Sequence, residues 1–226
     1  MVDYLHKILD WSEVWALFIP LIVLLFNRRH PTTLKPIISY LWLAFILNLS
    51  IDIIFLINVY YHKFVMSNNF LYNMHSVTRL VCFGLYFMQL PRGSFTKFKK
   101  VLAIVSAIFI VINFSFFEKF FNYNTFSGNL LSAEAYILLV YCMLYYLTEL
   151  KDDSDNLFNS PHFWIVTGLS IYVVINFFVF LFYIPMFDVD ENLAANIWNV
   201  HNIAFIIFCL FIAKALYGSN RYKYSV

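Results

Sequence analysis

Seven apolar stretches, most of them long enough to cross a lipid bilayer, constrain this chain more than any other feature. They cover residues 13–27, 36–59, 69–90, 99–117, 126–149, 162–187 and 194–217, and each is bounded by polar residues, proline or glycine. A membrane-spanning helix needs about 20 predominantly apolar residues, and longer stretches cross with some tilt. The first stretch is the shortest and is expected to extend outward into the Trp11–Trp15 segment. The sequence therefore predicts an all-α integral membrane protein, a seven-transmembrane helix bundle.

The composition agrees with a chain surrounded mainly by lipid. Of its 226 residues, 62% are hydrophobic and only 12% are charged, whereas a soluble domain has about 25% charged residues. The net charge of +2 is too small to indicate a nucleic-acid partner. Cys82, Cys142 and Cys209 each lie inside an apolar stretch without paired spacing, which indicates no disulfide framework.

The positions of the lysines and arginines predict the orientation. Short cytoplasmic loops of membrane proteins are enriched in Lys and Arg. One set of loops and ends holds eleven of the fifteen: Arg28, Arg29, Lys35, Arg92, Lys97, Lys99, Lys100, Lys151, Lys214, Arg221 and Lys223. The opposite set holds Lys7, Lys63 and Lys119. The N-terminus is therefore expected outside and the C-terminus in the cytoplasm.

This topology assigns almost the whole chain to the bundle. Residues 1–12 form an extracytoplasmic segment, residues 13–217 the seven-helix bundle, and residues 218–226 a cytoplasmic tail. The first residues, MVDYLHKILDWSE, lack the pattern of a removable signal peptide. The loops are too short for a soluble catalytic domain, and the chain has neither a P-loop, a GxSxG elbow, an HExxH helix nor an obvious internal repeat.

Polar and ionisable residues inside the stretches mark a candidate site, because such residues are costly in a membrane and usually face the bundle interior. A rise of about 1.5 Å per residue places several of them about 5–7 Å on the outer side of the midplane, with Arg79 near the centre. They define a predicted ligand pocket in the outer half of the bundle: Asn48, Asp52, His75, Arg79, Asn113, Glu134, Asn176, Asn199, His201 and Asn202.

Helical spacing gives these residues expected neighbours. Asn48 and Asp52 share one face of their helix, as do His75 and Arg79. Arg79 needs an anionic partner: Asp52 is the nearest candidate in sequence and depth, and Glu134 is the alternative. A purely structural role, fixing the register of the helices through hydrogen bonds, is the competing interpretation. The basic residues Arg92, Lys97, Lys99 and Lys100 are expected to attract anionic lipid.

The last 60 residues resemble a group of uncharacterised bacterial seven-helix membrane proteins, which are similar to the membrane input modules of sensor histidine kinases. Ser160-Pro161-His162-Phe163-Trp164, Gly168, Tyr172 and Asn176 carry the resemblance in the sixth stretch. Trp198, His201 and Asn202 carry it in the seventh. The resemblance implies a multi-pass protein of the bacterial inner membrane. Because no kinase domain follows here, output would pass to a separate histidine kinase or other signalling partner.

Three functions fit the predicted pocket. The first is a sensor or receptor, without a cofactor, for a small-molecule or lipid ligand. The second is a zinc-dependent lipid hydrolase with His75, His201, Asp52 and Glu134 as ligands; seven-helix hydrolases of the alkaline ceramidase type carry HxxxH in the last helix, whereas Phe205 follows His201 at that spacing here. The third is a small transporter or proton-coupled permease. The sensor is the favoured hypothesis.

Overall fold

The computed structural model describes residues 8–27, 30–61, 67–90, 95–122, 125–151, 157–187 and 189–222, and this part of the chain is all-helical. Its long helices are α2 (Ser12–Phe26), α3 (Lys35–Tyr60), α4 (Asn69–Gln89), α5 (Thr96–Ile112), α6 (Gly128–Lys151), α7 (Pro161–Phe187) and α8 (Glu191–Tyr222). Short helical turns are η1 (Thr32–Leu34), η2 (Asn113–Phe117) and η3 (Leu157–Asn159).

Each of the seven apolar stretches forms one of the long helices. The boundaries follow local signals. Pro36 and Pro161 lie in the first turns of α3 and α7. Proline is tolerated there because the backbone N–H that it lacks would have no acceptor within the helix. Ser127 precedes α6, and its hydroxyl accepts a hydrogen bond from the Leu130 N–H at 3.0 Å, as an N-cap does. The fourth stretch is α5 followed by the π-helical turn η2.

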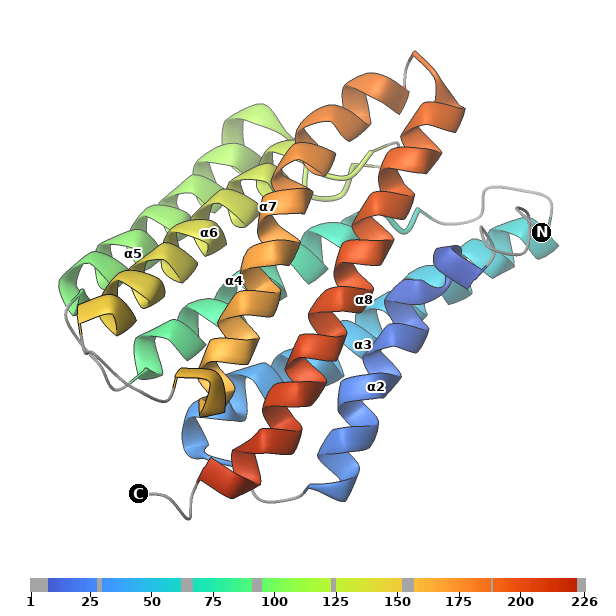
Figure 1. Ribbon diagram of the computed structural model, residues 1–226. Helices are drawn as coiled ribbons and strands as arrows, with labels where there is room; N and C mark the ends of the chain where they lie inside the picture. Colours follow the sequence, from blue (N-terminus) through green and yellow to red (C-terminus); the bar gives the residue numbers. More distant parts are fainter. Residues whose placement is uncertain are drawn as a thin grey trace.

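Six of these helices pack in a closed ring, in the order α2, α3, α4, α6, α7, α8 and back to α2. α5 lies outside this ring, against α4 and α6. Figure 1 shows α7 and α8 running side by side, with α2 next to α8 and with α5 at the far edge beyond α6. The ring brings side chains from distant parts of the sequence to a common centre.

Aromatic side chains fill the centre of the ring. Tyr40 of α3, Phe83 of α4 and Phe208 of α8 contact one another with ring centroids 5.1–6.3 Å apart. Tyr172 of α7 stacks on Phe208 at 5.1 Å. All four are almost completely buried. Aromatic pairs at such distances add about 0.5–1.5 kcal/mol each beyond the burial of their area, so this cluster holds the helices of the ring together.

Among the described residues, five helical segments are long and apolar enough to cross a membrane, which marks the chain as a multi-pass membrane protein. They are Thr32–Tyr60, Thr96–Phe117, Gly128–Lys151, Pro161–Tyr183 and Leu193–Ser219. The two other long helices, α2 and α4, are not among these five segments, for two different reasons. α2 has only 15 residues. α4 carries polar side chains, among them Asn73, His75 and Arg79, but these are buried against neighbouring helices.

One expectation about the basic residues is wrong. Lys99 is buried, with 4% of its surface exposed, and its Nζ donates a hydrogen bond to the carbonyl of Phe87 at 3.2 Å. That carbonyl belongs to the last turn of α4, where backbone acceptors lack partners within the helix. Lys99 therefore caps α4 and does not face lipid, whereas Lys97 and Lys100 are exposed. Arg92 lies outside the described residues.

Candidate functional site

A buried ion pair between α4 and α6 forms one end of the site. The Arg79 guanidinium contacts both carboxylate oxygens of Glu134: Nε pairs with Oε1, and Nη2 donates to Oε2 at 2.9 Å. Only 4% of Arg79 and 2% of Glu134 is exposed. The prediction that Asp52 pairs with Arg79 is wrong, and the alternative with Glu134 is confirmed. α4 and α6 are neighbours in the ring, so Glu134 reaches Arg79 from the adjacent helix.

Two further side chains complete the hydrogen bonds of this pair. Ser76, one turn before Arg79, donates to Glu134 Oε2. Arg79 Nη1 donates to the hydroxyl of Tyr172, which links α7 to the pair. A two-point contact between Arg and a carboxylate is geometrically specific. The pair therefore fixes how α4, α6 and α7 are placed relative to one another.

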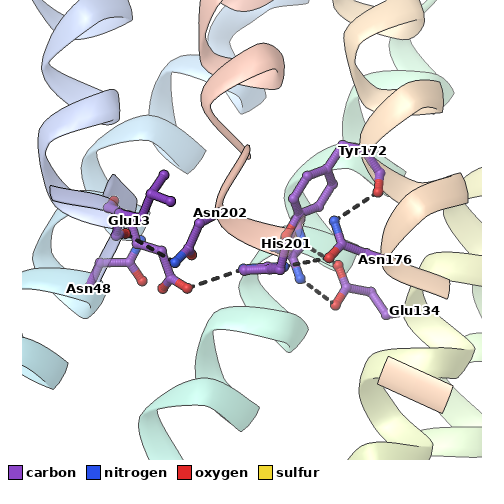
Figure 2. Close-up of polar contacts among 9 residues, drawn as sticks. Glu13, Asn48, Glu134, Tyr172, Asn176, His201 and Asn202 are labelled. Atoms are coloured by element: carbon purple, nitrogen blue, oxygen red, sulfur yellow. Dashed lines mark hydrogen bonds and ion pairs between the residues drawn. The ribbon is translucent and has the colours of Figure 1, made fainter. Parts of the chain in front are cut away.

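His201 of α8 connects this region to α2. Asn176 Nδ2 donates to the carbonyl of Tyr172 at 2.8 Å, which turns its Oδ1 toward His201 Nδ1. On the opposite side of the imidazole, His201 Nε2 lies 3.1 Å from the Glu13 carboxylate. Figure 2 shows His201 between these two partners, with Asn176 on one side and Glu13 on the other. The imidazole thus bridges α7 and α2.

Both ring nitrogens of His201 face oxygen acceptors. The imidazole can donate from one of these nitrogens when it is neutral and from both when it is protonated.

Two asparagines, one from α3 and one from α8, contact the backbone at and just before the N-terminal end of α2. Asn48 of α3 donates to the carbonyl of Glu13 at 3.0 Å, and Asn202 of α8 donates to the carbonyl of Leu9 at 3.0 Å. Figure 2 shows Asn48, Glu13 and Asn202 grouped together, apart from Glu134 and Tyr172. Since Leu9 and Glu13 are four residues apart, the two contacts lie about 6 Å apart along the chain axis.

Some oxygen atoms of these residues and of their neighbours along α2 and α3 have no hydrogen-bond partner within the described residues. Asn48, Asn202 and Ser12 are each at most 1% exposed. Within the described part of the chain, Asn48 Oδ1, Asn202 Oδ1 and Ser12 Oγ are buried atoms with no hydrogen-bond partner. The same holds for Oδ2 of Asp52, one turn beyond Asn48 on α3 and within electrostatic reach of the Glu13 carboxylate. We call these four residues, together with Glu13, the acceptor cluster.

The remaining predicted residues have different surroundings. His75 is buried and stacks on Tyr40 with centroids 6.1 Å apart, and its Nε2 has no partner among the described residues. It lies within electrostatic reach of Arg79 and His201. Asn199 of α8 is partly buried.

Asn113 belongs to a separate cluster that closes the connection between α5 and α6. Its Nδ2 donates to Glu118 at 2.9 Å and lies 3.2 Å from the Ser127 hydroxyl, which itself contacts Glu118. Asn73 of α4 supports the same connection by donating to the Phe120 carbonyl and accepting from the Ser127 N–H, both at 2.8 Å. These side chains satisfy the backbone of a tight connection, so Asn113 has a structural environment and does not join the ligand cluster.

Two of the four side chains suggested as zinc ligands are engaged by other partners. Glu134 is engaged by Arg79, and His201 by Asn176 and Glu13. Among the described residues, no group of three or more His, Cys, Asp and Glu side chains has an arrangement that could hold a metal ion. His75, His201, Asp52 and Glu134 therefore do not form the predicted tetrahedral set.

Two cavities of the described structure lie away from the acceptor cluster. One, of about 420 Å³, lies where α5, α6 and α7 meet and is lined by Phe109, Glu118, Asn129, Ser132 and Pro185 among others. The second, of about 320 Å³, is an apolar groove between α4 and α5 that includes Gly84 and Ala107. The residues of the acceptor cluster line neither of these two cavities.

Sequence reasoning missed three residues of the site. Glu13 stands at the edge of the first apolar stretch, although it is the only acidic residue within 13–27. Ser76 shares a helical face with Arg79, which is three residues further on. Tyr172 was noted only for the resemblance. Tyr172, Asn176 and His201, all of which carry that resemblance, meet where α7 and α8 face each other.

The chain matches no known family model, and no curated protein or solved structure is significantly similar to it.

Proposed function

We propose that this chain is a receptor-like membrane sensor that binds a small polar ligand at the acceptor cluster. The observation that carries the proposal is the set of buried oxygens on Ser12, Asn48 and Asn202 that have no hydrogen-bond partner among the residues that the structure describes. A buried polar atom without a hydrogen bond costs about 1–3 kcal/mol. A ligand that supplies the missing donors would recover this cost, so the cluster has a physical reason to bind one.

The proposal includes a seven-helix topology with the N-terminus outside and the C-terminus in the cytoplasm. α2 and α4 would join the five long apolar segments as spans. The polar side chains of α4 are buried inside the ring, which supports a membrane position despite their polarity. The excess of Lys and Arg on one set of loops supports the orientation. The acceptor cluster would then lie in the outer half of the bundle.

Labelling of introduced cysteines tests the orientation. The three native cysteines are buried and should react slowly. In intact cells a membrane-impermeant maleimide should label the Lys119→Cys chain, because residue 119 is exposed in a connection predicted to face outward. The Lys97→Cys chain should be labelled only after the membrane is permeabilised. The reverse pattern would invert the topology, and labelling of both in intact cells would remove α5 as a span.

Ligand binding at the cluster would affect the inner side of the bundle by changing the packing of α2. This helix contacts α8 through Glu13 and His201 and contacts α3 through Asn48. A ligand that holds these contacts in one arrangement would favour one of two packings of α2, to the extent that its affinity differs between them. A separate signalling partner, such as a histidine kinase, would then read the inner ends of the helices.

Equilibrium dialysis tests whether the cluster binds a ligand. The full chain in nanodiscs is dialysed against a mixed pool of small cations, anions and neutral polar compounds, and retained compounds are measured by mass spectrometry. We expect at least one compound to be retained by the wild-type chain and by the Glu149→Gln control. Glu149 lies near the C-terminal end of α6, a helix that contributes no residue to the acceptor cluster. The Asn202→Leu chain should lose it. Retention of no Asn202-dependent compound would refute the proposal.

A distance measurement separates a sensor from a simple binding protein. Phe26 and Leu150 are exposed at the inner ends of α2 and α6. Spin labels on the Phe26→Cys, Leu150→Cys chain should show a changed distance distribution in pulsed EPR when the retained compound is added. An unchanged distance distribution at full occupancy by the compound would mean that the site binds a ligand but does not signal.

A further inference from the structure

The apolar groove of about 320 Å³ between α4 and α5 opens on the outside of the helix ring. Val81 of α4 and Ala107 of α5 line its two walls, and both are exposed. On α4 the groove extends from Leu80 to Met88, which corresponds to about 12 Å at the rise of an α-helix. Half of the hydrocarbon core of a bilayer is about 15 Å thick. The groove is therefore long enough for most of one leaflet.

The polar groups that line the groove already have partners, which defines the kind of ligand that fits. The Ser106 hydroxyl donates to the carbonyl of Leu102 at 2.7 Å, and the Tyr141 hydroxyl donates to the carbonyl of Lys99 at 3.1 Å. The other lining residues are apolar. A polar compound would lose its hydrogen bonds to water and gain none in exchange, whereas a hydrocarbon chain needs none. The groove therefore favours an acyl chain.

The packing of α5 leaves room for such a chain. α5 is part of the least buried of the five apolar segments, and it lies outside the ring, against α4 and α6 (Figure 1). A Cβ added at Gly84, in the wall formed by α4, would meet nothing within 4 Å. An acyl chain in the groove would supply van der Waals contacts that α4 and α5 do not make with each other there.

Positive charge lies at one end of the groove, near the start of α5. Lys100 precedes Ala103 and Ala107, two residues of the groove wall, by three and seven positions, so it shares their helix face. Lys100 is exposed, whereas Lys99 is buried beside the groove, where its carbonyl accepts from Tyr141. Neither lysine forms an ion pair with a carboxylate of the described residues. An anionic group at this end would therefore meet two lysines that no described acid neutralises.

The N-terminal end of α5 also favours an anion. Its N-cap residue, Phe95, supplies no side-chain acceptor for the N–H groups of the first turn. These N–H groups lack acceptors within the helix, and together with the helix dipole they attract negative charge. A phosphate group at this position would interact both with the helix end and with Lys100.

We propose that the groove between α4 and α5 binds one acyl chain of an anionic phospholipid, with the phosphate beside Lys100 at the N-terminal end of α5. One molecule can reach both places because Lys100 lies one helical turn, about 4.5 Å, from Ala103. A zwitterionic lipid fits less well, since it brings a positive charge of its own to the lysines. The predicted topology places this end in the cytoplasmic leaflet, which carries anionic lipid. The proposal does not depend on a ligand at the acceptor cluster.

Photo-cross-linking of the full chain in phosphatidylcholine vesicles tests the proposal. A trace of phosphatidylglycerol with a photoactivatable acyl chain is added, and labelled peptides are identified by mass spectrometry. We expect label on the peptides that hold Val81 and Ala107. Unlabelled phosphatidylglycerol should displace it, whereas inorganic phosphate should not. Photoactivatable phosphatidylcholine should label the same peptides several times less.

Four variants separate the head-group contact from the groove. Lys100→Gln should raise the fraction of phosphatidylglycerol needed for half displacement about fivefold, as expected for one lysine near an anionic group. Lys35→Gln is the matched control, because Lys35 is an exposed lysine on the same predicted side but begins α3; it should leave this fraction unchanged. Gly84→Leu and Ala107→Leu fill the groove from opposite walls and should each abolish the labelling. Unfolding midpoints close to that of the wild-type chain identify the variants that fold.

The opposite results would overturn the proposal. Equal labelling by photoactivatable phosphatidylcholine would mean that the groove takes any lipid chain regardless of charge. Equal effects of Lys100→Gln and Lys35→Gln would assign the preference to the general positive charge of this side. Displacement by inorganic phosphate would indicate an anion site without a lipid. Absence of label from the wild-type groove would mean that another occupant, such as a second copy of the chain, covers it.

Discussion

Replacing Arg79 with leucine should destabilise the bundle by about 3–5 kcal/mol, because it leaves the Glu134 carboxylate buried without its partner. Glu134→Leu should have a similar effect, since it leaves the guanidinium uncompensated. Restoring the charge alone by Arg79→Lys should recover only part of the loss, because lysine lacks the fork that contacts both carboxylate oxygens and Tyr172.

The double replacement Arg79→Leu, Glu134→Leu is the informative member of this set. A buried ion pair is often replaced by apolar side chains at little cost once both charges are gone. The double variant should therefore be more stable than either single variant, with a coupling energy of at least about 1.5 kcal/mol, within the range measured for residues in contact. Equilibrium unfolding in mixed detergent micelles measures all four chains.

The exposed Lys100 is the control for this series. Lys100→Leu removes one positive charge from the same protein but leaves no buried partner, so its effect should stay within about 0.5 kcal/mol, as for most surface substitutions. If the two single variants and the control prove equally stable, the Arg79–Glu134 pair does not hold α4 and α6 together.

Gly168→Ala should destabilise the contact between α7 and α8 by about 1–3 kcal/mol, the usual cost of inserting a carbon into a packed interface. A Cβ at position 168 would lie 2.5 Å from the Cβ of Phe211 and 3.0 Å from its Cγ. The Phe211 Cβ is fixed to the backbone of α8, so the clash is relieved only by moving the helices apart. Because α7 and α8 form the most extensive helix contact of the ring, the substitution should lower the stability of the whole ring of helices.

Gly84 provides the matched control. It lies within α4, and a Cβ added there would meet nothing within 4 Å. Gly84→Ala should therefore leave stability unchanged or raise it by up to about 1 kcal/mol, because alanine favours the helical backbone more than glycine does. The two alanine variants are compared in the same micelle titration. Equal stability of the two would mean that α7 and α8 do not approach as closely at Gly168 as described.

The helices of this protein could be predicted from the sequence because apolar stretches bounded by loops carry the signal locally. Each stretch corresponds to one long helix, and Pro36 and Pro161 mark two of the starts. The least regular part, the turn at Asn113–Phe117, was absorbed into the fourth stretch. A π-helical turn differs from an α-helix by one hydrogen-bond step, and nothing in the residue pattern reports that difference.

The site could be predicted only in part. Depth along each helix follows from residue counting, and it predicts one layer that holds Asp52, His75, Glu134, Asn113 and His201. Asn113 instead contacts Glu118 and Ser127 in a separate cluster. Which residue faces which depends on the order of helices in the ring. Asp52 was the nearest acid to Arg79 in sequence, but α6, not α3, presents its carboxylate to the guanidinium. The separation of two residues in the sequence does not tell whether they pair across a bundle. Each helix in the ring packs against two others, and these need not be its neighbours in the chain.

What the sequence by itself determined is where the helices are and that several carry buried polar groups, since both depend on the hydropathy and spacing of residues within one stretch. Only the tertiary structure decided which groups neutralise one another. It joined Glu13, near the start of the described chain, to His201, 188 residues later, through the contact of α2 with α8. It also left Asp52 without a cation among the described residues, because pairing depends on the packing order of helices and not on their order in the chain.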